Sequence, residues 1–302
     1  MSLRADGYRN MSATKLNLRT QEIYTCLFTL DGKHALTGAQ GNPVALWDLT
    51  TGNCLRNFEH SGPVWALAWS KDQRLFLSLD GIMRLWDAEA GRCLRQFAGR
   101  HARSVAWSDD HKKVLTASDS ALQLTDLESG QCLRKLNGHT DGIYCAAFDL
   151  NQQRALSGSR DQTVRIWDIE TGRCISVLKG HTYHVHGVLW AADERRAISC
   201  SRDIRLWDLQ AERCLQVFSG HTDTIRTVQW SANQLWVLSA AHDRTVRLWE
   251  AETGRCIRVF EGHTAGVVAA AFSGDGRKSF SCDWNGSIFE WDLRPYEQMA
   301  TA

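Results

Sequence analysis

Residues 138–168 read GHTDGIYCAAFDLNQQRALSGSRDQTVRIWD, and this stretch holds the pattern that decides the fold. Short β-branched or aromatic runs at Ile143–Phe148, Arg154–Ser157 and Thr163–Trp167 alternate with turn residues, and a fourth run, Cys132–Leu136, precedes them. Short runs bounded by turns are typical of β-strands, and no window carries the 3.6-residue apolar period of a helix. The sequence therefore predicts an all-β chain.

The Trp-Asp pair that ends this stretch, Trp167-Asp168, recurs along the 302 residues at a spacing of 39 to 42 residues. A period of this length indicates a repeat architecture. Seven units of four short strands predict a seven-bladed β-propeller of four-stranded antiparallel blades, because radial closure leaves only short sheet edges. The counterparts of Trp167-Asp168 in the other six units are Trp47-Asp48, Trp86-Asp87, Thr125-Asp126, Trp207-Asp208, Trp249-Glu250 and Trp291-Asp292.

Three features of the central unit resemble the WD-repeat β-propeller family: Gly138-His139, the turn Ser157–Asp161, and Ile166-Trp167-Asp168. The likeness covers roughly residues 12–293, and the recurrent GRCLRxF-type linkers are similar to those of bacterial members. The resemblance implies one propeller domain over residues 12–293, with short tails at 1–11 and 294–302.

The two ends of the chain indicate how the ring closes. The last unit stops at Leu293 without a following Cys-Leu-Arg strand, whereas Ser12–Phe28 aligns without gaps on Cys132–Phe148. We therefore expect Ser12–Leu16 to form the outer strand of blade seven, so that the N-terminal strand closes the propeller.

A His, a Ser, an Asp and a Trp recur together in units four, five and six, whereas a catalytic triad would not need three copies. The resemblance implies that each set forms a buried hydrogen-bonded tetrad, in which every polar group is satisfied. The expected tetrads are His139, Ser157, Asp161 and Trp167; His181, Ser199, Asp203 and Trp207; and His221, Ser239, Asp243 and Trp249.

The other four units depart from this set, so we expect the first three blades to be the less stable half. The turn of blade five is interpreted as two residues short, and those of blades two and three as one short each. Blade seven keeps His263, Ser281 and Trp291, and blade two keeps His60, Asp80 and Trp86. The expected departures are Asn285 for Asp in blade seven, Leu77 for Ser in blade two, Arg19 for His and Gly41 for Asp in blade one, and Thr125 for Trp in blade three.

Other groups of reactive side chains are interpreted as structural. Six cysteines recur once per outer strand, so they cannot converge on one metal ion or reach disulfide distance. His184 and His186 in HTYHVHG have no carboxylate or thiol nearby, and no phosphate-binding or hydrolase motif occurs. We expect no catalytic residue, no metal and no cofactor, and therefore no enzyme.

In this family one face of the ring, around the central channel, usually binds peptides, and two positions per blade point there. The first follows the residue that opens the innermost strand, and the second precedes the tetrad Asp. None of the fourteen residues carries a carboxylate. Ten of them are the proposed partner-binding residues, and the four that are left out are Val268, Gln40, Leu79 and Ser118. The first set is Tyr24, Trp65, Arg103, Tyr144, His186, Arg226 and Val268, and the second is Gln40, Leu79, Ser118, Arg160, Arg202, His242 and Trp284.

Arginine and aromatic side chains are enriched at binding hot spots, and arginines suit carboxylates and phosphates. We expect a non-catalytic protein–protein interaction scaffold whose ligand is a partner protein or peptide, with an acidic or phosphorylated segment as the sharper hypothesis. The alternatives are a propeller enzyme, a small-ligand-binding propeller and, less favoured, a lipid-binding propeller.

The composition narrows the class of partner. The 35 Lys and Arg against 34 Asp and Glu leave a net charge of +1, which disfavours nucleic acid. No apolar run is long enough for a membrane span, and the first residues lack a signal sequence. We expect a cytoplasmic protein with no membrane partner, monomeric by itself.

Overall fold

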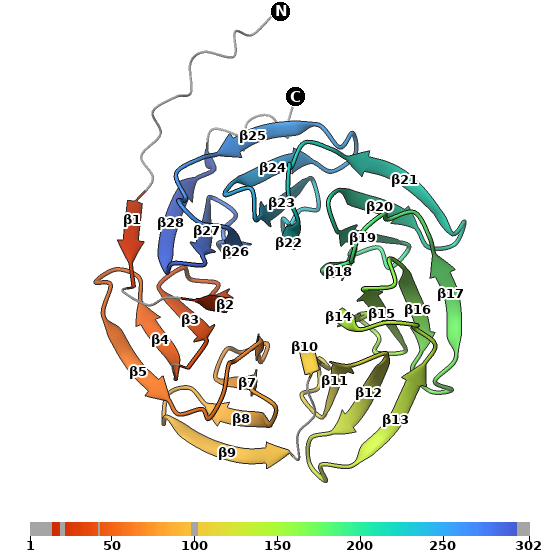
Figure 1. Ribbon diagram of the computed structural model, residues 1–302, viewed down its shortest axis with the longest axis horizontal. Helices are drawn as coiled ribbons and strands as arrows, with labels where there is room; N and C mark the ends of the chain where they lie inside the picture. Colours follow the sequence, from red (N-terminus) through yellow and green to blue (C-terminus); the bar gives the residue numbers. More distant parts are fainter. Residues whose placement is uncertain (1–13, 19–21, 42, 98–101, 295–302) are drawn as a thin grey trace, which may run out of the picture.

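The computed structural model describes residues 14–18, 22–41, 43–97 and 102–294, and these residues contain 28 β-strands in seven four-stranded sheets. The sheets stand radially around a central channel as seven blades (Figure 1). In six blades the four strands follow one another from the channel to the rim, and in blade seven the outermost strand comes from the N-terminus. The predicted all-β, seven-bladed antiparallel propeller is confirmed.

The strands are short and of similar length in every blade. From channel to rim, blade one contains β2 (Ile23–Phe28), β3 (His34–Ala39), β4 (Val44–Asp48) and β5 (Cys54–Phe58); blade two β6 (Ala66–Trp69), β7 (Leu75–Leu79), β8 (Met83–Asp87) and β9 (Arg92–Phe97); blade three β10 (Ala102–Trp107), β11 (Lys113–Ser118), β12 (Ala121–Asp126) and β13 (Cys132–Asn137); blade four β14 (Ile143–Phe148), β15 (Arg154–Ser159), β16 (Val164–Asp168) and β17 (Cys174–Leu178). Blade five contains β18 (Gly187–Trp190), β19 (Arg196–Cys200), β20 (Ile204–Asp208) and β21 (Arg213–Phe218); blade six β22 (Ile225–Trp230), β23 (Trp236–Ala241), β24 (Val246–Glu250) and β25 (Cys256–Phe260); blade seven β26 (Val267–Phe272), β27 (Lys278–Asp283), β28 (Ser287–Asp292) and β1 (Thr14–Asn17).

The hydrophobic core lies between neighbouring blades. Leu156 of β15 is fully buried in a cluster that also contains Val188 and Trp207 of the next blade. The rim strands are more exposed, and in β5 only Phe58 is buried. Because a single blade cannot cover its own apolar faces, each blade depends on its neighbours for stability.

The N-terminal strand pairs with the last strand of blade seven, as predicted. β1 is antiparallel to β28 with Leu16 opposite Ile288, and the backbone N–H of Leu18 donates to the carbonyl of Gly286 at 3.0 Å. Leu16 and Leu18 pack into the cluster that joins blades one and seven. Ser12 and Ala13, which belong to the predicted strand, lie outside the described residues, as do residues 1–11 and 295–302 of the tails.

Blade four contains the chain of hydrogen bonds that the resemblance implies. His139 Nδ1 donates to Asp161 Oδ2 at 2.7 Å, and His139 Nε2 accepts from Ser157 Oγ at 2.7 Å. Trp167 Nε1 donates to the same hydroxyl at 2.8 Å. The corresponding groups of blades five and six make the same bonds at 2.6–2.8 Å. The three serines are fully buried, so their hydroxyls serve the fold.

Blade seven completes its tetrad with a residue that differs from the sequence prediction. His263 Nδ1 lies 2.9 Å from Asp283 Oδ2, so Asn285 is not the acidic partner. Asp283 ends β27 two residues before Asn285, and its buried carboxylate also accepts the backbone N–H groups of Asn285 and Ser287. The carboxylate therefore reaches the histidine from the strand and not from the turn.

Blade two also differs, because its turn is two residues short, as in blade five, and not one. The serine of the tetrad is therefore Ser78 and not Leu77: His60 Nε2 lies 2.6 Å from Ser78 Oγ, and Trp86 Nε1 donates to it at 2.9 Å. His60 Nδ1 lies 2.7 Å from the carbonyl of Phe58 instead of reaching Asp80. In blade one, Arg19 lies outside the described residues.

Candidate binding site at the channel mouth

All innermost strands begin on the same face of the ring, which we call the channel mouth. The first set of predicted residues lies at or next to these strand starts. The turns between second and third strands lie on the same face, because their backbone N–H groups bond to residues that precede the inner strands, as Arg160 does to Gly142 at 2.7 Å. All ten proposed partner-binding residues are at least partly exposed: Tyr24, Trp65, Arg103, Tyr144, Arg160, His186, Arg202, Arg226, His242 and Trp284.

Three of the other four predicted positions are buried and do not belong to the surface. Val268 packs with Trp284 in the cluster between blades seven and one. Leu79 and Ser118 are the last residues of β7 and β11, where they pair with Ala66 and Ala102. The prediction that Leu79 and Ser118 lie on the surface is wrong because the turns that follow them are shorter than the turn of blade four.

The expectation that no carboxylate occupies these positions is wrong for blade three. Its turn position is taken by the exposed Asp119, one residue after Ser118. Asp119 and Asp141 line a hollow of about 390 Å³ together with Arg103, Tyr144 and Arg160. Arg160 Nε lies 3.5 Å from Asp141 Oδ2, so part of the positive charge of Arg160 is already balanced within the protein.

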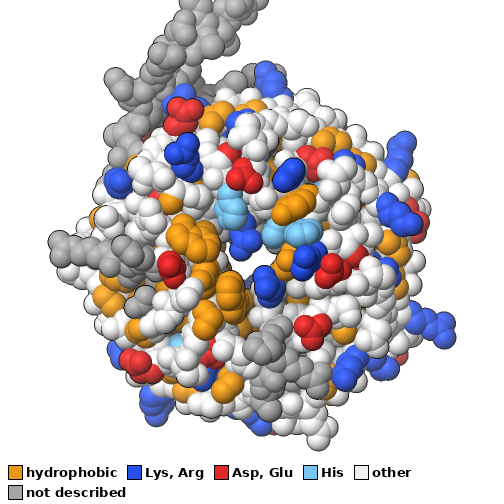
Figure 2. Space-filling model, in the orientation of Figure 1, with side chains coloured by type: hydrophobic (Ala, Val, Ile, Leu, Met, Phe, Trp, Pro, Cys, Tyr) orange, Lys and Arg blue, Asp and Glu red, His pale blue; other side chains and the backbone are white. Residues whose placement is uncertain are grey.

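Three aromatic residues form one side of the channel mouth, which we call the aromatic shelf: Tyr24, Trp65 and Trp284. The rings of Tyr24 and Trp65 stack with centroids 4.3 Å apart, and Trp284 meets Tyr24 edge-on at 5.0 Å. Trp65 remains 40% exposed, so its ring can cover a ligand. Figure 2 shows hydrophobic side chains gathered on one side of the opening, with Lys, Arg and His side chains on the other.

Arg103 connects the shelf to the polar side of the mouth. Its guanidinium lies over the rings of Trp65 and Tyr144, at 5.5 and 5.3 Å from their centroids. Tyr144 in turn stacks on His186 at 4.9 Å. These contacts form a continuous line of rings and guanidinium groups across four neighbouring blades, which restricts the side chains before any ligand binds.

Three further residues of the channel mouth form what we call the basic cluster: His186, Arg226 and His242. Arg226 Nη1 lies 3.4 Å from His186 Nδ1. Burial, with the charge of Arg226 as the second cause, lowers the pKa of His186 to about 3 and also lowers the pKa of His242. Both histidines are therefore neutral at pH 7, and within the described part of the chain no carboxylate forms an ion pair with Arg226.

The structure adds Tyr183 to the residues that the sequence suggested. Arg202 Cζ lies 4.5 Å from the centroid of the Tyr183 ring, and Tyr183 stacks on His184 at 4.2 Å. Tyr183 precedes the innermost strand of blade five, so an aromatic residue in that loop was the available signal. Among the described residues, no group of three His, Cys, Asp or Glu side chains could hold a metal ion.

Comparison with known proteins supports the repeat assignment. The family model described as WD domain, G-beta repeat, matches residues 52–87, 91–126, 130–168, 172–208, 212–250 and 254–292, together well over half of the chain. No match begins before residue 52, in the part of the chain where Gly41 replaces the usual Asp. No curated protein matches the chain. No helix in the described residues is long and apolar enough to cross a membrane.

Proposed function

The chain belongs to the WD-repeat family, and on this premise we propose that it is a non-catalytic scaffold that binds an acidic or phosphorylated segment of a partner protein. Propellers of this family commonly act as protein-interaction scaffolds. A fold does not by itself identify a function, so the proposal depends on the chemistry of the channel mouth.

The observation that carries the proposal is the environment of Arg226. Its side chain is mostly buried, burial lowers its pKa, and the charge of Arg103 lowers it further. A buried cation without a counter-ion is unfavourable, because desolvation is not repaid by an ion pair. A carboxylate or phosphate from outside the chain would supply that counter-ion through charge-assisted hydrogen bonds.

The aromatic shelf adds a second requirement on the ligand. Trp65 and Tyr24 offer flat, rigid apolar surface at the side of the mouth opposite the basic cluster. Aromatic residues of this kind contribute strongly at the centres of interfaces. We therefore infer a segment in which an acidic or phosphorylated residue stands close to a hydrophobic or aromatic one.

Peptide selection tests this proposal. A random peptide library is selected against wild type, Arg226→Gln, Trp65→Ala and a control, Arg195→Gln, which removes an exposed arginine from a turn on the opposite face. We expect wild type and the control to enrich peptides with Asp or Glu beside an apolar residue. Arg226→Gln should lose the acidic preference, and Trp65→Ala should lose the apolar one. Because Trp65 is exposed, its variant should fold normally.

The alternatives have distinct outcomes in the same experiment. Identical peptides from wild type and both variants would contradict the site, and no enrichment by any variant would favour an enzyme or a small-ligand propeller. The lipid alternative has weaker structural support, because Arg196 of the Arg195-Arg196 pair is engaged by Asp193 at 2.7 Å and Glu252 at 3.7 Å.

A further inference from the structure

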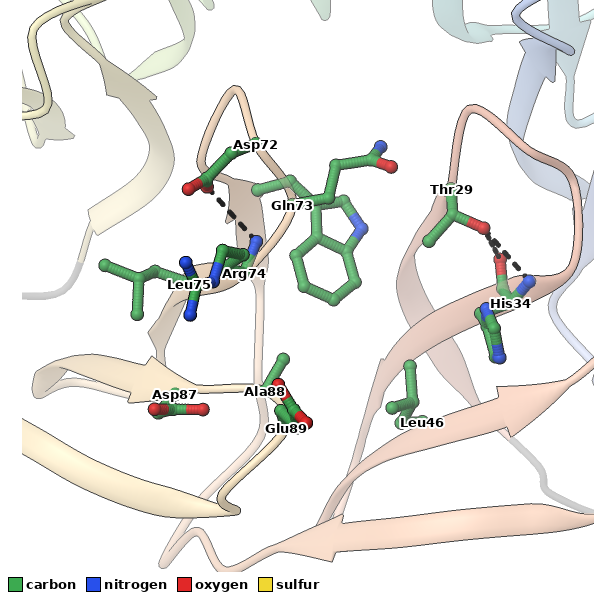
Figure 3. Close-up of a pocket in the computed structure, with 11 residues that line it drawn as sticks. Thr29, His34, Leu46, Asp72, Gln73, Arg74, Leu75, Asp87, Ala88 and Glu89 are labelled. Atoms are coloured by element: carbon green, nitrogen blue, oxygen red, sulfur yellow. Dashed lines mark hydrogen bonds between the residues drawn. The ribbon is translucent and has the colours of Figure 1, made fainter.

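A cavity of about 410 Å³ lies between blades one and two, on the face opposite the channel mouth (Figure 3). It is lined by the turns that follow β2 and β6 and by the ends of β4 and β8. These four strands all run from the channel mouth toward the opposite face. Figure 3 draws Thr29, His34 and Leu46 on one side of it and Arg74, Leu75 and Asp87 on the other.

The same place between blades four and five is filled by the chain itself. Arg154 opens β15, and its Cζ lies 4.6 Å from the centroid of the Trp190 ring of blade five. Arg154 also bonds to Asp149 Oδ2 at 3.0 Å and to the carbonyl of Glu194 at 3.3 Å. A cation at this distance from a Trp ring is attracted by its π-system.

Blade one carries a shorter residue at the position of Arg154. His34 opens β3 and pairs with Asp48, as Arg154 opens β15 and pairs with Asp168. Across the gap, Trp69 ends β6 as Trp190 ends β18. The indole of Trp69 therefore faces the cavity in the place where Trp190 receives a guanidinium.

The indole N–H groups at this level differ from blade to blade. Trp107 and Trp190 donate to carbonyls of the preceding blade, at 3.1 Å to Ala68 and 3.3 Å to Ala147. Among the described residues, the buried Nε1 of Trp69 has no hydrogen-bond partner, and neither has that of Trp230 at the end of β22. Blades one and two therefore lack both links that blades four and five have at this level, the guanidinium over the Trp ring and the indole hydrogen bond.

The charges of the cavity suit a cation. Asp72, Asp87 and Glu89 line it against a single arginine, Arg74. The hydroxyl of Ser70 and the backbone N–H of Arg74 lower the pKa of Asp72, so its carboxylate is ionised at neutral pH. Leu46 and the buried Ala88 supply apolar walls for the methylene groups of a long side chain.

We propose that this cavity, which we call the blade-one pocket, binds the guanidinium of an arginine side chain from a partner protein, with the guanidinium over Trp69 as Arg154 lies over Trp190. The bound arginine is held by the Trp69 ring and by the lining carboxylates. This site is separate from the channel mouth and does not depend on the proposed function of that face.

Nuclear magnetic resonance of the indole N–H groups tests the proposal. The full-length ¹⁵N-labelled protein is titrated at pH 7 with the blocked peptide acetyl-Ala-Arg-Ala-amide, and the Trp69 signal is assigned by its loss in Trp69→Phe. We expect a saturable shift of that signal. The same peptide with citrulline, which has the shape of arginine without its charge, should give no saturable shift. An equal response to the two peptides would overturn the proposal.

Three substitutions make the test specific for this pocket. His34→Arg should fill the pocket from within and abolish the shift, whereas Lys113→Arg, at the equivalent position of blade three, should leave it unchanged. Arg154→His should open the equivalent pocket and create a new arginine-dependent shift at Trp190. Retention of the Trp69 shift in folded His34→Arg would overturn the proposal, as would tighter binding of free L-arginine than of the blocked peptide.

Discussion

Blades four to six and blades one and two are built from the same repeat but hold their polar groups differently. In blade four, His139 connects the turn carboxylate of Asp161 to Ser157 and through it to Trp167. In blade two, His60 turns to the carbonyl of Phe58, at the end of β5 in blade one. In blade one only the last link is described, with Trp47 Nε1 donating to Thr37 Oγ1 at 2.9 Å.

The difference shows which part of the tetrad the fold keeps. The bond from the indole to a hydroxyl is present in blades one and two, whereas in blade two, within the described residues, the histidine makes no bond to the turn carboxylate. In blade two the freed carboxylate of Asp80 pairs with Arg84 instead. The hydroxyl and indole connect two strands of one sheet, while the histidine connects the turn, so the turn is the part that can be remodelled.

The largest expected effect on stability comes from removing β1, the strand that closes the ring. Deleting residues 1–17 removes β1 and leaves the edge of β28 unpaired, so the melting temperature should fall by on the order of 10 °C. A calorimetric scan measures this fall. A synthetic peptide of residues 12–18 should restore part of the loss, and a scrambled peptide should not. An unchanged melting temperature would show that the ring does not depend on β1.

The next prediction compares the contribution to stability of a complete tetrad, in blade four, with that of the incomplete one in blade one. Ser157→Ala leaves both His139 Nε2 and Trp167 Nε1 without a partner in a buried site, which should cost about 2–4 kcal/mol of unfolding free energy. Thr37→Val leaves only the indole of Trp47 unpaired and should cost about 1–2 kcal/mol. Urea denaturation measures both values, and equal losses would contradict the distinction between the blades.

A smaller effect tests the corrected tetrad of blade seven. Asp283→Asn keeps the shape of the side chain but weakens its bond to His263, and we expect a loss of about 1–2 kcal/mol. Asn285→Ala removes an exposed side chain and should change stability by less than about 0.5 kcal/mol. The reverse order, measured by urea denaturation, would restore Asn285 as the partner of the histidine.

The smallest effect is a pH dependence that the histidine tetrads introduce. Burial lowers the pKa of His139, so below about pH 6.5 the unfolded chain binds a proton that the folded chain resists, and stability falls with acid. Burial alone would raise the pKa of Asp161, but bonds from Thr163 and His139 lower it to about 2, which extends the loss from about pH 4 downward.

Melting temperatures between pH 7 and pH 5 test this expectation. His139→Asn should flatten the fall with acid relative to wild type. His111→Asn, which changes a histidine in the turn between β10 and β11 outside any tetrad, is the control. An identical slope in His139→Asn and wild type would exclude the buried histidine as a source of the pH dependence.

Much of the fold follows from local sequence signals. The predictions that are wrong concern turns whose length differs between repeats and residues whose position changes within a repeat. The repeat of the Trp-Asp pair predicted seven blades, and the alignment of Ser12–Phe28 predicted the pairing of β1 with β28. The repeat predicts Leu77 in the tetrad of blade two, but the turn there is two residues short and not one, so Ser78 takes this position. The repeat predicts Asn285 in blade seven, where the carboxylate comes instead from Asp283 at the end of the strand.

The candidate site was predicted less completely than the fold, because position in a repeat does not specify burial. Tyr24, Trp65 and Arg103 were predicted to lie at the channel mouth, and the structure places them there, with Trp65 in contact with both of the others. Val268 holds an equivalent position but is buried under a neighbouring blade. Asp119 and Tyr183 were missed, since one depends on the length of a turn and the other on a loop that the repeat does not define.

The sequence by itself determined the strands, their number and the closure of the ring, because these depend on patterns within about forty residues and on their repetition. Only the tertiary structure decided what happens between blades, where side chains some forty residues apart meet. The mostly buried charge of Arg226 and the cavity between His34 and Trp69 both arise there, since each depends on the size and charge of residues supplied by a neighbouring blade.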